Sequence, residues 1–198
     1  MPVALPEPLW LEWLALAGLF GFAGWLLGGR GVLGLLLRSD PTGITLAILI
    51  LFVAATLWCG ARARLLQRER GRLQGAGGWA ADYRKARAAD PAAALELLLE
   101  STHGPHGPAW WVNGLQLKLG LLGKVIGFSM LALEIGSARS FDPAQSPELL
   151  RSLTSGLGVA LLTTMVGLVG NILLGLQLTR LDRYADALAA DIQRQGLS

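Results

Sequence analysis

The chain has 198 residues, of which 53% are hydrophobic and only 16% are charged, with 26 glycines, 7 tryptophans and a net charge of +3. A soluble domain usually carries about 25% charged residues, so this composition excludes an ordinary soluble domain and predicts an integral membrane protein. The basic balance does not indicate nucleic acid binding, because the arginines flank apolar runs instead of covering one face. The single cysteine, Cys59, excludes an intramolecular disulfide and a site built from several cysteines.

Four apolar stretches follow one another along the chain, at residues 10–29, 41–61, 117–136 and 152–179. A membrane-spanning helix needs about 20 such residues. The second and fourth stretches contain no charged residue, whereas the first carries Glu12 near its start. We therefore predict an all-α membrane protein with four spanning helices, or three if the first stretch lies in the membrane interface.

These stretches divide the chain into five parts. They are an N-terminal membrane segment (1–38), a spanning helix with a basic cytoplasmic extension (39–74), a short cytoplasmic helical region and loop (75–115), a core spanning helix with an outer loop (116–151) and a second core helix with a cytoplasmic tail (152–198). Two of the spanning helices are thus expected to extend into the cytoplasm.

Basic side chains predict the orientation of these parts. Eight of them follow the second stretch: Arg62, Arg64, Arg68, Arg70, Arg72, Arg84, Lys85 and Arg87. The loop between the third and fourth stretches has Arg139 and Arg151 against Asp142 and Glu148. By the positive-inside rule, the basic connection and the C-terminal tail lie in the cytoplasm, and four spans place the N-terminus there as well.

Helix-start signals mark three boundaries, because a capping side chain precedes a proline at the expected first helical position. They are Asp40-Pro41, Asp90-Pro91 and Ser146-Pro147. The helix from Pro41 is expected to continue to the glycine cluster at 75–78, and the helix from Pro147 to Gln193. In this tail, an apolar stripe recurs at helical spacing and is expected to pack on neighbouring copies in an oligomer: Leu181, Tyr184, Leu188 and Ile192.

The stretch STHGPHGPAWW (101–111) is broken by glycine and proline, and it predicts a loop with solvated histidines at 103 and 106. No third ligand stands nearby, so we expect no metal. Tryptophans near the ends of the stretches are expected to anchor at the membrane interface: Trp10, Trp13, Trp58, Trp110 and Trp111. Phosphate-binding, nucleophile and metalloprotease motifs do not occur, so we predict neither an enzyme nor a cofactor.

The third stretch carries glycines on one helical face, at Gly120, Gly123 and Gly127, in a spacing typical of close helix packing. Two charges, Lys124 and Glu134, lie beside this face. Charged groups are costly inside a membrane, so both side chains are expected to face protein or water.

The fourth stretch carries a continuous stripe of small and polar residues: Gly156, Ala160, Thr164, Gly167, Asn171 and Gly175, with Thr163 at its edge. One interpretation is close helix contact, with each threonine bonded to its own helix. The other interpretation is a helix face that lines a pore or contacts a partner helix, where its hydroxyl and amide groups solvate a polar group.

The segments GLLGKVIG (120–127) and ALLTTMVGL (160–168) together resemble the MotA/TolQ/ExbB family of proton-channel and stator subunits. The resemblance covers about residues 40–193 and fits the predicted order of spans. It implies a homopentamer in a bacterial inner membrane, around two copies of a single-span MotB/TolR/ExbD-like partner with a membrane aspartate. Such a complex couples the proton-motive force to mechanical or transport work at the envelope.

By this resemblance, Thr164 corresponds to the family threonine of the second core helix, whose hydroxyl can hydrogen-bond the partner carboxylate. Lys124 stands where the family has threonine, which leaves an alternative open: a pentameric scaffold that conducts no protons. The candidate ion-path residues are Thr163, Thr164, Asn171, Lys124 and Glu134. The candidate packing residues are Gly120, Gly123, Gly127, Gly156 and Gly167.

Overall fold

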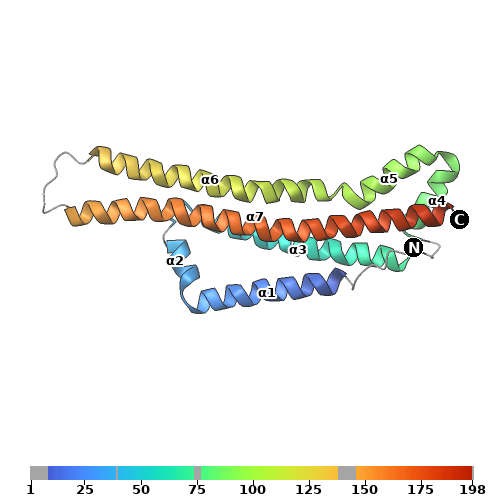
Figure 1. The fold of residues 1–198 in the computed structure, drawn as a ribbon, viewed down its shortest axis with the longest axis horizontal. Coiled ribbons are helices and arrows are strands. Elements are labelled where there is room, and N and C mark those ends of the chain that lie inside the picture. Colours follow the sequence, from blue (N-terminus) through green and yellow to red (C-terminus); the bar gives the residue numbers. More distant parts are fainter. Residues whose placement is uncertain (1–8, 39, 74–76, 138–145, 198) are drawn as a thin grey trace. The chain divides into compact units, whose positions relative to one another are not determined.

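The computed structural model describes residues 9–38, 40–73, 77–137 and 146–197. These residues form seven helices and no strand: α1 (Leu9–Gly29), α2 (Val32–Arg38), α3 (Ile44–Gly71), α4 (Trp79–Ala89), α5 (Pro91–His103), α6 (His106–Ser137) and α7 (Ser146–Leu197) (Figure 1). Four described stretches are long and apolar enough to cross a membrane: Leu9–Gly29, Ile44–Gly71, Pro91–Gly136 and Leu153–Gly196. The prediction of an all-α protein with four stretches suited to span a membrane is confirmed for the described residues.

The helix after Asp90 starts where its capping signal predicts, whereas the helix after Asp40 starts later than predicted. The Asp90 carboxylate accepts hydrogen bonds from the first two backbone N–H groups that follow Pro91 in α5, as predicted. The expected start of α3 at Pro41 is wrong, because Gly43 takes a left-handed conformation (φ 72°) and the helix begins at Ile44. Asp40 still caps it across this turn, through the N–H of Thr45 at 2.6 Å. The side chain of Ser146 lies outside the described residues.

The predicted loop over residues 101–111 is wrong, since only Gly104 and Pro105 separate α5 from α6. Gly104 has helical backbone angles (φ −46°, ψ −49°), so the chain hardly leaves the helical path. Proline is tolerated at a helix start, where its missing N–H has no partner to lose. α6 therefore starts at His106, well before the third apolar stretch.

The chain folds as two compact units. Unit 1 contains Met1–Phe20, Ala54–Trp111 and Leu174–Ser198, and unit 2 contains Gly21–Val53 and Val112–Leu173. Unit 1 has a conventional apolar core, to which α3, α4, α5 and α7 contribute Leu66, Ala80, Leu98 and Leu188.

The tail stripe belongs to the core of unit 1. Leu181, Tyr184, Leu188 and Ile192 are all buried within the single chain. The Arg70 guanidinium of α3 lies 5.4 Å from the centre of the Tyr184 ring. The prediction that neighbouring copies cover this stripe is therefore wrong, because the chain's own helices cover it.

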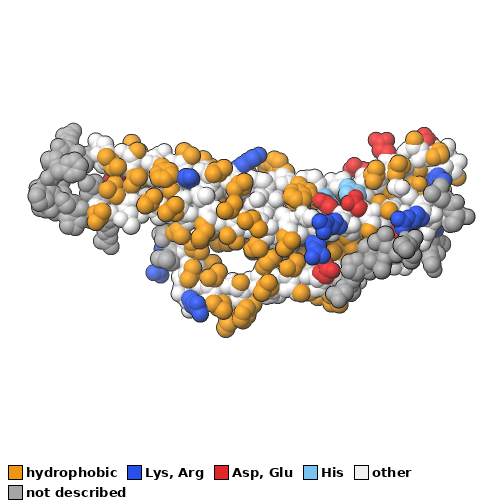
Figure 2. Space-filling view, viewed as in Figure 1, with side chains coloured by type: hydrophobic (Ala, Val, Ile, Leu, Met, Phe, Trp, Pro, Cys, Tyr) orange, Lys and Arg blue, Asp and Glu red, His pale blue; other side chains and the backbone are white. Residues whose placement is uncertain are grey.

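The helices of unit 2 expose apolar side chains, which contribute to the orange surface in Figure 2. On α6 and α7 these include Leu121, Val125, Phe128, Leu161, Leu168 and Ile172. A surface of this kind is suited to lipid or to other membrane helices.

Candidate functional site

In unit 2, α6 and α7 touch through their backbones. A side chain at Gly127 would place its Cβ 2.6 Å from the backbone nitrogen of Ala160 and 2.7 Å from the carbonyl oxygen of Gly156. At Gly167, a Cβ would lie 2.7 Å from the carbonyl oxygen of Gln116. These distances are too short for any larger residue, so glycine alone permits the contact.

The remaining candidate packing glycines lie at the same contact. A Cβ at Gly120 would lie 3.1 Å from the carbonyl oxygen of Thr163, and one at Gly123 would lie 2.6 Å from the Cβ of Thr163. Gly156 lies across from Gly127, where a Cβ would be 3.1 Å from its carbonyl oxygen. Because α6 and α7 meet in opposite residue order, the two helices run antiparallel here.

Thr163 and Thr164 have different surroundings. Thr163 is fully buried above Gly123, and its hydroxyl donates to the carbonyl of Val159 at 2.7 Å. Thr164 is half-buried, and its hydroxyl lies 2.7 Å from the carbonyl of Ala160 and 3.2 Å from that of Gly120. Thr163 thus fills the helix contact, while Thr164 stands at its margin.

Asn171 and Lys124 lie on the same margin as Thr164. The Asn171 amide donates to the carbonyl of Asn113 on α6 at 2.9 Å, and about two helical turns away the Thr164 hydroxyl donates to the carbonyl of Gly120. Lys124 follows Gly120 by one helical turn and so lies on that face of α6. We call Lys124, Thr164 and Asn171 the polar edge.

Lys124 is exposed on the single chain, with its ammonium nitrogen 6.0 Å from the centre of the Phe128 ring. Among the described residues, no carboxylate forms an ion pair with it. Glu134 is exposed too, but it lies about 15 Å further along α6 and does not join the polar edge.

Two buried amides in the same contact escaped the sequence analysis. Gln116 is fully buried, its Oε1 faces Gly170, and within the described chain neither amide atom has a hydrogen-bond partner. Asn113 is buried beside it. Both residues lie just before the predicted third apolar stretch, which begins at residue 117. The available signal was the spacing of residues 113, 116 and 120, which continues the glycine face backwards.

Unit 1 contains a buried polar cluster that the sequence did not predict. Arg62 of α3 donates through Nε to His106 Nε2 at 3.2 Å. Its Nη2 donates to the carbonyls of Ser101 and Thr102 at 2.7 and 2.9 Å. His106 is only 3% exposed, and its Nδ1 lies 2.6 Å from Asp182 Oδ1 of α7.

This geometry defines the protonation of His106. Because Nε2 accepts from Arg62, the ring proton is on Nδ1 and is donated to Asp182. The other carboxylate oxygen of Asp182 accepts from the Trp110 indole at 2.9 Å. A neutral imidazole thus bridges a cation on α3 and an anion on α7. We call Arg62, His106 and Asp182 the histidine clasp.

The other histidine forms an outer counterpart of this clasp. His103 Nε2 lies 3.0 Å from Asp186 Oδ1, with side chains 31% and 73% exposed. The expectation of a solvated histidine is thus wrong for His106, which is buried, whereas the His103 side chain is partly exposed. The described residues contain no group of three or more His, Cys, Asp or Glu that could hold a metal ion.

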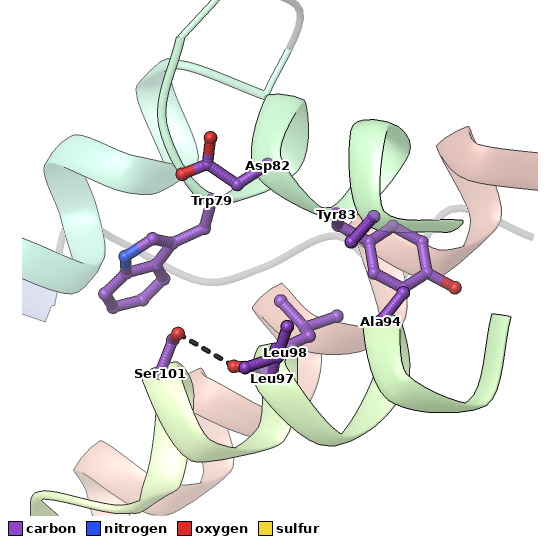
Figure 3. A pocket seen from close by; sticks show the side chains of 8 residues that line it. Trp79, Asp82, Tyr83, Ala94, Leu97, Leu98 and Ser101 are labelled. Carbon is purple, nitrogen blue, oxygen red and sulfur yellow. Dashed lines mark hydrogen bonds between the residues drawn. The ribbon is translucent and has the colours of Figure 1, made fainter. Parts of the chain in front are cut away.

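A small hollow of about 70 Å³ lies between α4 and α5 (Figure 3). Its walls are mostly apolar, from Trp79, Tyr83, Leu97 and Leu98. The Ser101 hydroxyl in its lining already donates to the carbonyl of Leu97. Among the described residues, Asp82 is the one charged side chain in the lining, and the hollow is small and mostly apolar.

Comparison of the chain with protein-family models, with curated proteins and with solved structures finds no match.

Proposed function

We propose that this chain is the channel-forming subunit of a bacterial inner-membrane complex of the MotA/TolQ/ExbB kind. Five copies would enclose two copies of a single-span partner, and proton passage along the partner's membrane aspartate would drive work at the cell envelope. The observation that carries this proposal is the polar edge, where Lys124, Thr164 and Asn171 stand on one margin of a glycine-packed helix pair.

The position of Lys124 supports a partner with a carboxylate. The helical rise places this residue about 20 Å along α6 from both Trp111 and Ser137. If these ends lie near the two membrane surfaces, Lys124 is near the middle of a hydrocarbon core of about 30 Å. A cation at that depth is costly unless another charge or water meets it. A carboxylate on a neighbouring membrane helix supplies the opposite charge.

Thr164 supports a role in handling that carboxylate. Its hydroxyl proton is shared between the carbonyls of Ala160 and Gly120, and the bond to Gly120 is the longer one. A carboxylate that approaches the polar edge can accept this proton in place of Gly120. The hydroxyl oxygen can in turn accept from the protonated acid, so one side chain serves both states of the partner.

The second candidate function is a scaffold of the same architecture without proton conduction. The exposed cation at position 124 favours it, because a fixed positive charge stabilises a facing carboxylate in its ionised form. A carboxylate that never takes up a proton cannot carry one. The variant Lys124→Thr separates the two functions. If the chain is a scaffold, this variant assembles normally and gains no dependence on the proton gradient. If the chain is a channel, the variant changes the proton flux.

The test of the proposal is proton flux into vesicles that contain the full chain and its single-span partner. Thr164→Val is expected to reduce this flux at least tenfold. Thr154→Val is the matched control, since Thr154 lies on the same helix and its hydroxyl donates to the Leu150 carbonyl of its own turn. The flux of this control should stay within twofold of wild type. Equal flux in all three proteins would contradict the role of the polar edge.

A further inference from the structure

The start of α1 is held against α3 in unit 1 by tryptophan contacts. The backbone N–H of Trp10 donates to Gln67 Oε1 at 3.1 Å. The rings of Trp10 and Trp13 stack with centres 4.8 Å apart, and the Trp13 indole donates to the carbonyl of Thr56 at 3.1 Å. Gly60 leaves room for this ring, because a Cβ there would collide with it.

An open hollow of about 410 Å³ lies beside this junction, lined by Trp10, Arg64, Gln67 and Arg68. The Arg64 guanidinium lies over the Trp10 ring, 3.6 Å from its centre. The residues from α3 are spaced by three and four positions, so they share one face of the helix. The hollow thus combines an aromatic wall with two cations on one face.

These two cations differ from the other arginines of α3. Arg62 is buried in the histidine clasp, Arg70 pairs with Asp191 at 3.1 Å and Arg72 contacts Glu69 at 3.4 Å. Arg64 and Arg68 are exposed, and within the described part of the chain neither forms an ion pair. No described carboxylate pairs with their N–H groups, so these groups can bind an added anion.

The position of the hollow along α3 indicates where the anion comes from, because it places the hollow near the membrane surface. The charge-free run of the second stretch ends at Ala61. The helical rise puts Arg64 about 5 Å and Arg68 about 11 Å beyond that point. The polar layer on each side of a bilayer core is about 5–8 Å thick, so Arg64 lies within it and Arg68 lies just outside it. Arginines at this height beyond a spanning helix attract acidic lipids. Guanidinium groups also match the geometry of a phosphate.

We propose that this hollow binds the phosphate of an anionic phospholipid head group, with Arg64 and Arg68 as the cations and Trp10 as the wall at the interface. The bound lipid would hold the start of α1 and the middle of α3 together at the membrane surface. This site does not depend on the partner subunit or on proton passage.

Native mass spectrometry of the full chain in detergent, titrated with phosphatidylglycerol, tests the proposal. We expect the double variant Arg64→Gln/Arg68→Gln to bind this lipid at least tenfold more weakly than wild type. The matched control is Lys85→Gln/Arg183→Gln, which removes the same charge from exposed positions elsewhere, and it should stay within twofold. An equal loss in both double variants would overturn the proposal, because net charge alone would then account for binding.

Two further arms identify the ligand. Phosphatidylcholine should bind at least tenfold more weakly than phosphatidylglycerol to wild type, and equal binding would overturn the assignment to anionic lipid. Glycerol 3-phosphate, the soluble probe, should compete only at concentrations far above the lipid; if it binds as tightly as the lipid, the site takes a free phosphate and the lipid proposal fails. Should the double variant not fold, Arg68→Gln alone is expected to weaken lipid binding at least threefold, and an unchanged affinity would contradict the proposal.

Discussion

The two units of this chain hold their helices together by different means. In unit 2, α6 and α7 meet backbone to backbone at glycines, and the bonds across the contact come from small polar groups such as Thr164 and Asn171. In unit 1, the helices are joined by an apolar core and by charged side chains. The histidine clasp is part of this junction, and its His106 is only 3% exposed. A contact made of glycines has no room for added atoms, whereas the clasp depends on the charge of Asp182 opposite Arg62.

The largest expected effect is on the clasp. Asp182→Ala removes the acceptor of two hydrogen bonds and leaves the buried Arg62 charge without its counterpart. We expect a loss of about 2–3 kcal/mol in the free energy of unfolding, measured by denaturant titration in detergent. Asp186→Ala is the matched control, because the Asp186 carboxylate also pairs with a histidine, His103, but is 73% exposed. It should cost less than about 1 kcal/mol. Similar losses in both variants would show that the clasp is an ordinary surface pair.

The next effect distinguishes the glycine contact from general helix propensity. Gly127→Ala forces a methyl group to within 2.6 Å of the Ala160 backbone, and it is expected to lower the unfolding free energy by about 1–3 kcal/mol. Gly114→Ala, on the same helix with nothing within 4 Å of the added carbon, should raise it by about 1 kcal/mol. The sign difference is the readout. If both variants are stabilised, α6 and α7 do not touch at Gly127.

The smallest effect concerns the cap of α3. Burial alone would raise the pKa of Asp40, but hydrogen bonds from Thr42 and Thr45 outweigh it and hold the pKa below its usual value. The carboxylate therefore stabilises the fold above its unfolded pKa of about 3.9, and this contribution is lost as the pH falls through the lower folded value.

Asp40→Ala should thus cost about 1 kcal/mol at pH 7. The gap from wild type should close as the pH falls below about 4, when thermal unfolding of the two proteins is compared from pH 7 down to pH 3. A gap that stays constant over this range would mean that the charge of Asp40 plays no part in the cap.

The sequence was sufficient for features that depend on one helix alone. The glycine face at 120, 123 and 127 and the stripe on α7 follow from helical periodicity, so their residues could be named in advance. Most of α7 also follows from an apolar and capped pattern without a strong breaker, which predicts a helix from Pro147 to Gln193, and the helix itself extends to Leu197. The burial of the tail stripe in the core of unit 1 could not be predicted. Periodicity shows that a helix face is apolar, but it does not show which helix covers that face.

The histidine clasp could not be predicted in the same way. Its members come from positions 62, 106 and 182, on three helices whose pairing no local pattern indicates. The Gly104-Pro105 pair looked like a loop, although Gly104 has helical backbone angles and proline is tolerated next to a helix start. Gln116 and Asn113 were missed because α6 begins earlier than its apolar stretch does.

The most direct test of the central claim is the native mass of the detergent-purified chain, expressed with any single-span protein encoded beside it. If the polar edge faces a partner helix within a pentamer, the mass will equal five chains of 21.0 kDa, about 105 kDa, plus two copies of that partner. A monomer or a dimer without a partner would contradict the account, and the polar edge would then have no partner helix to face.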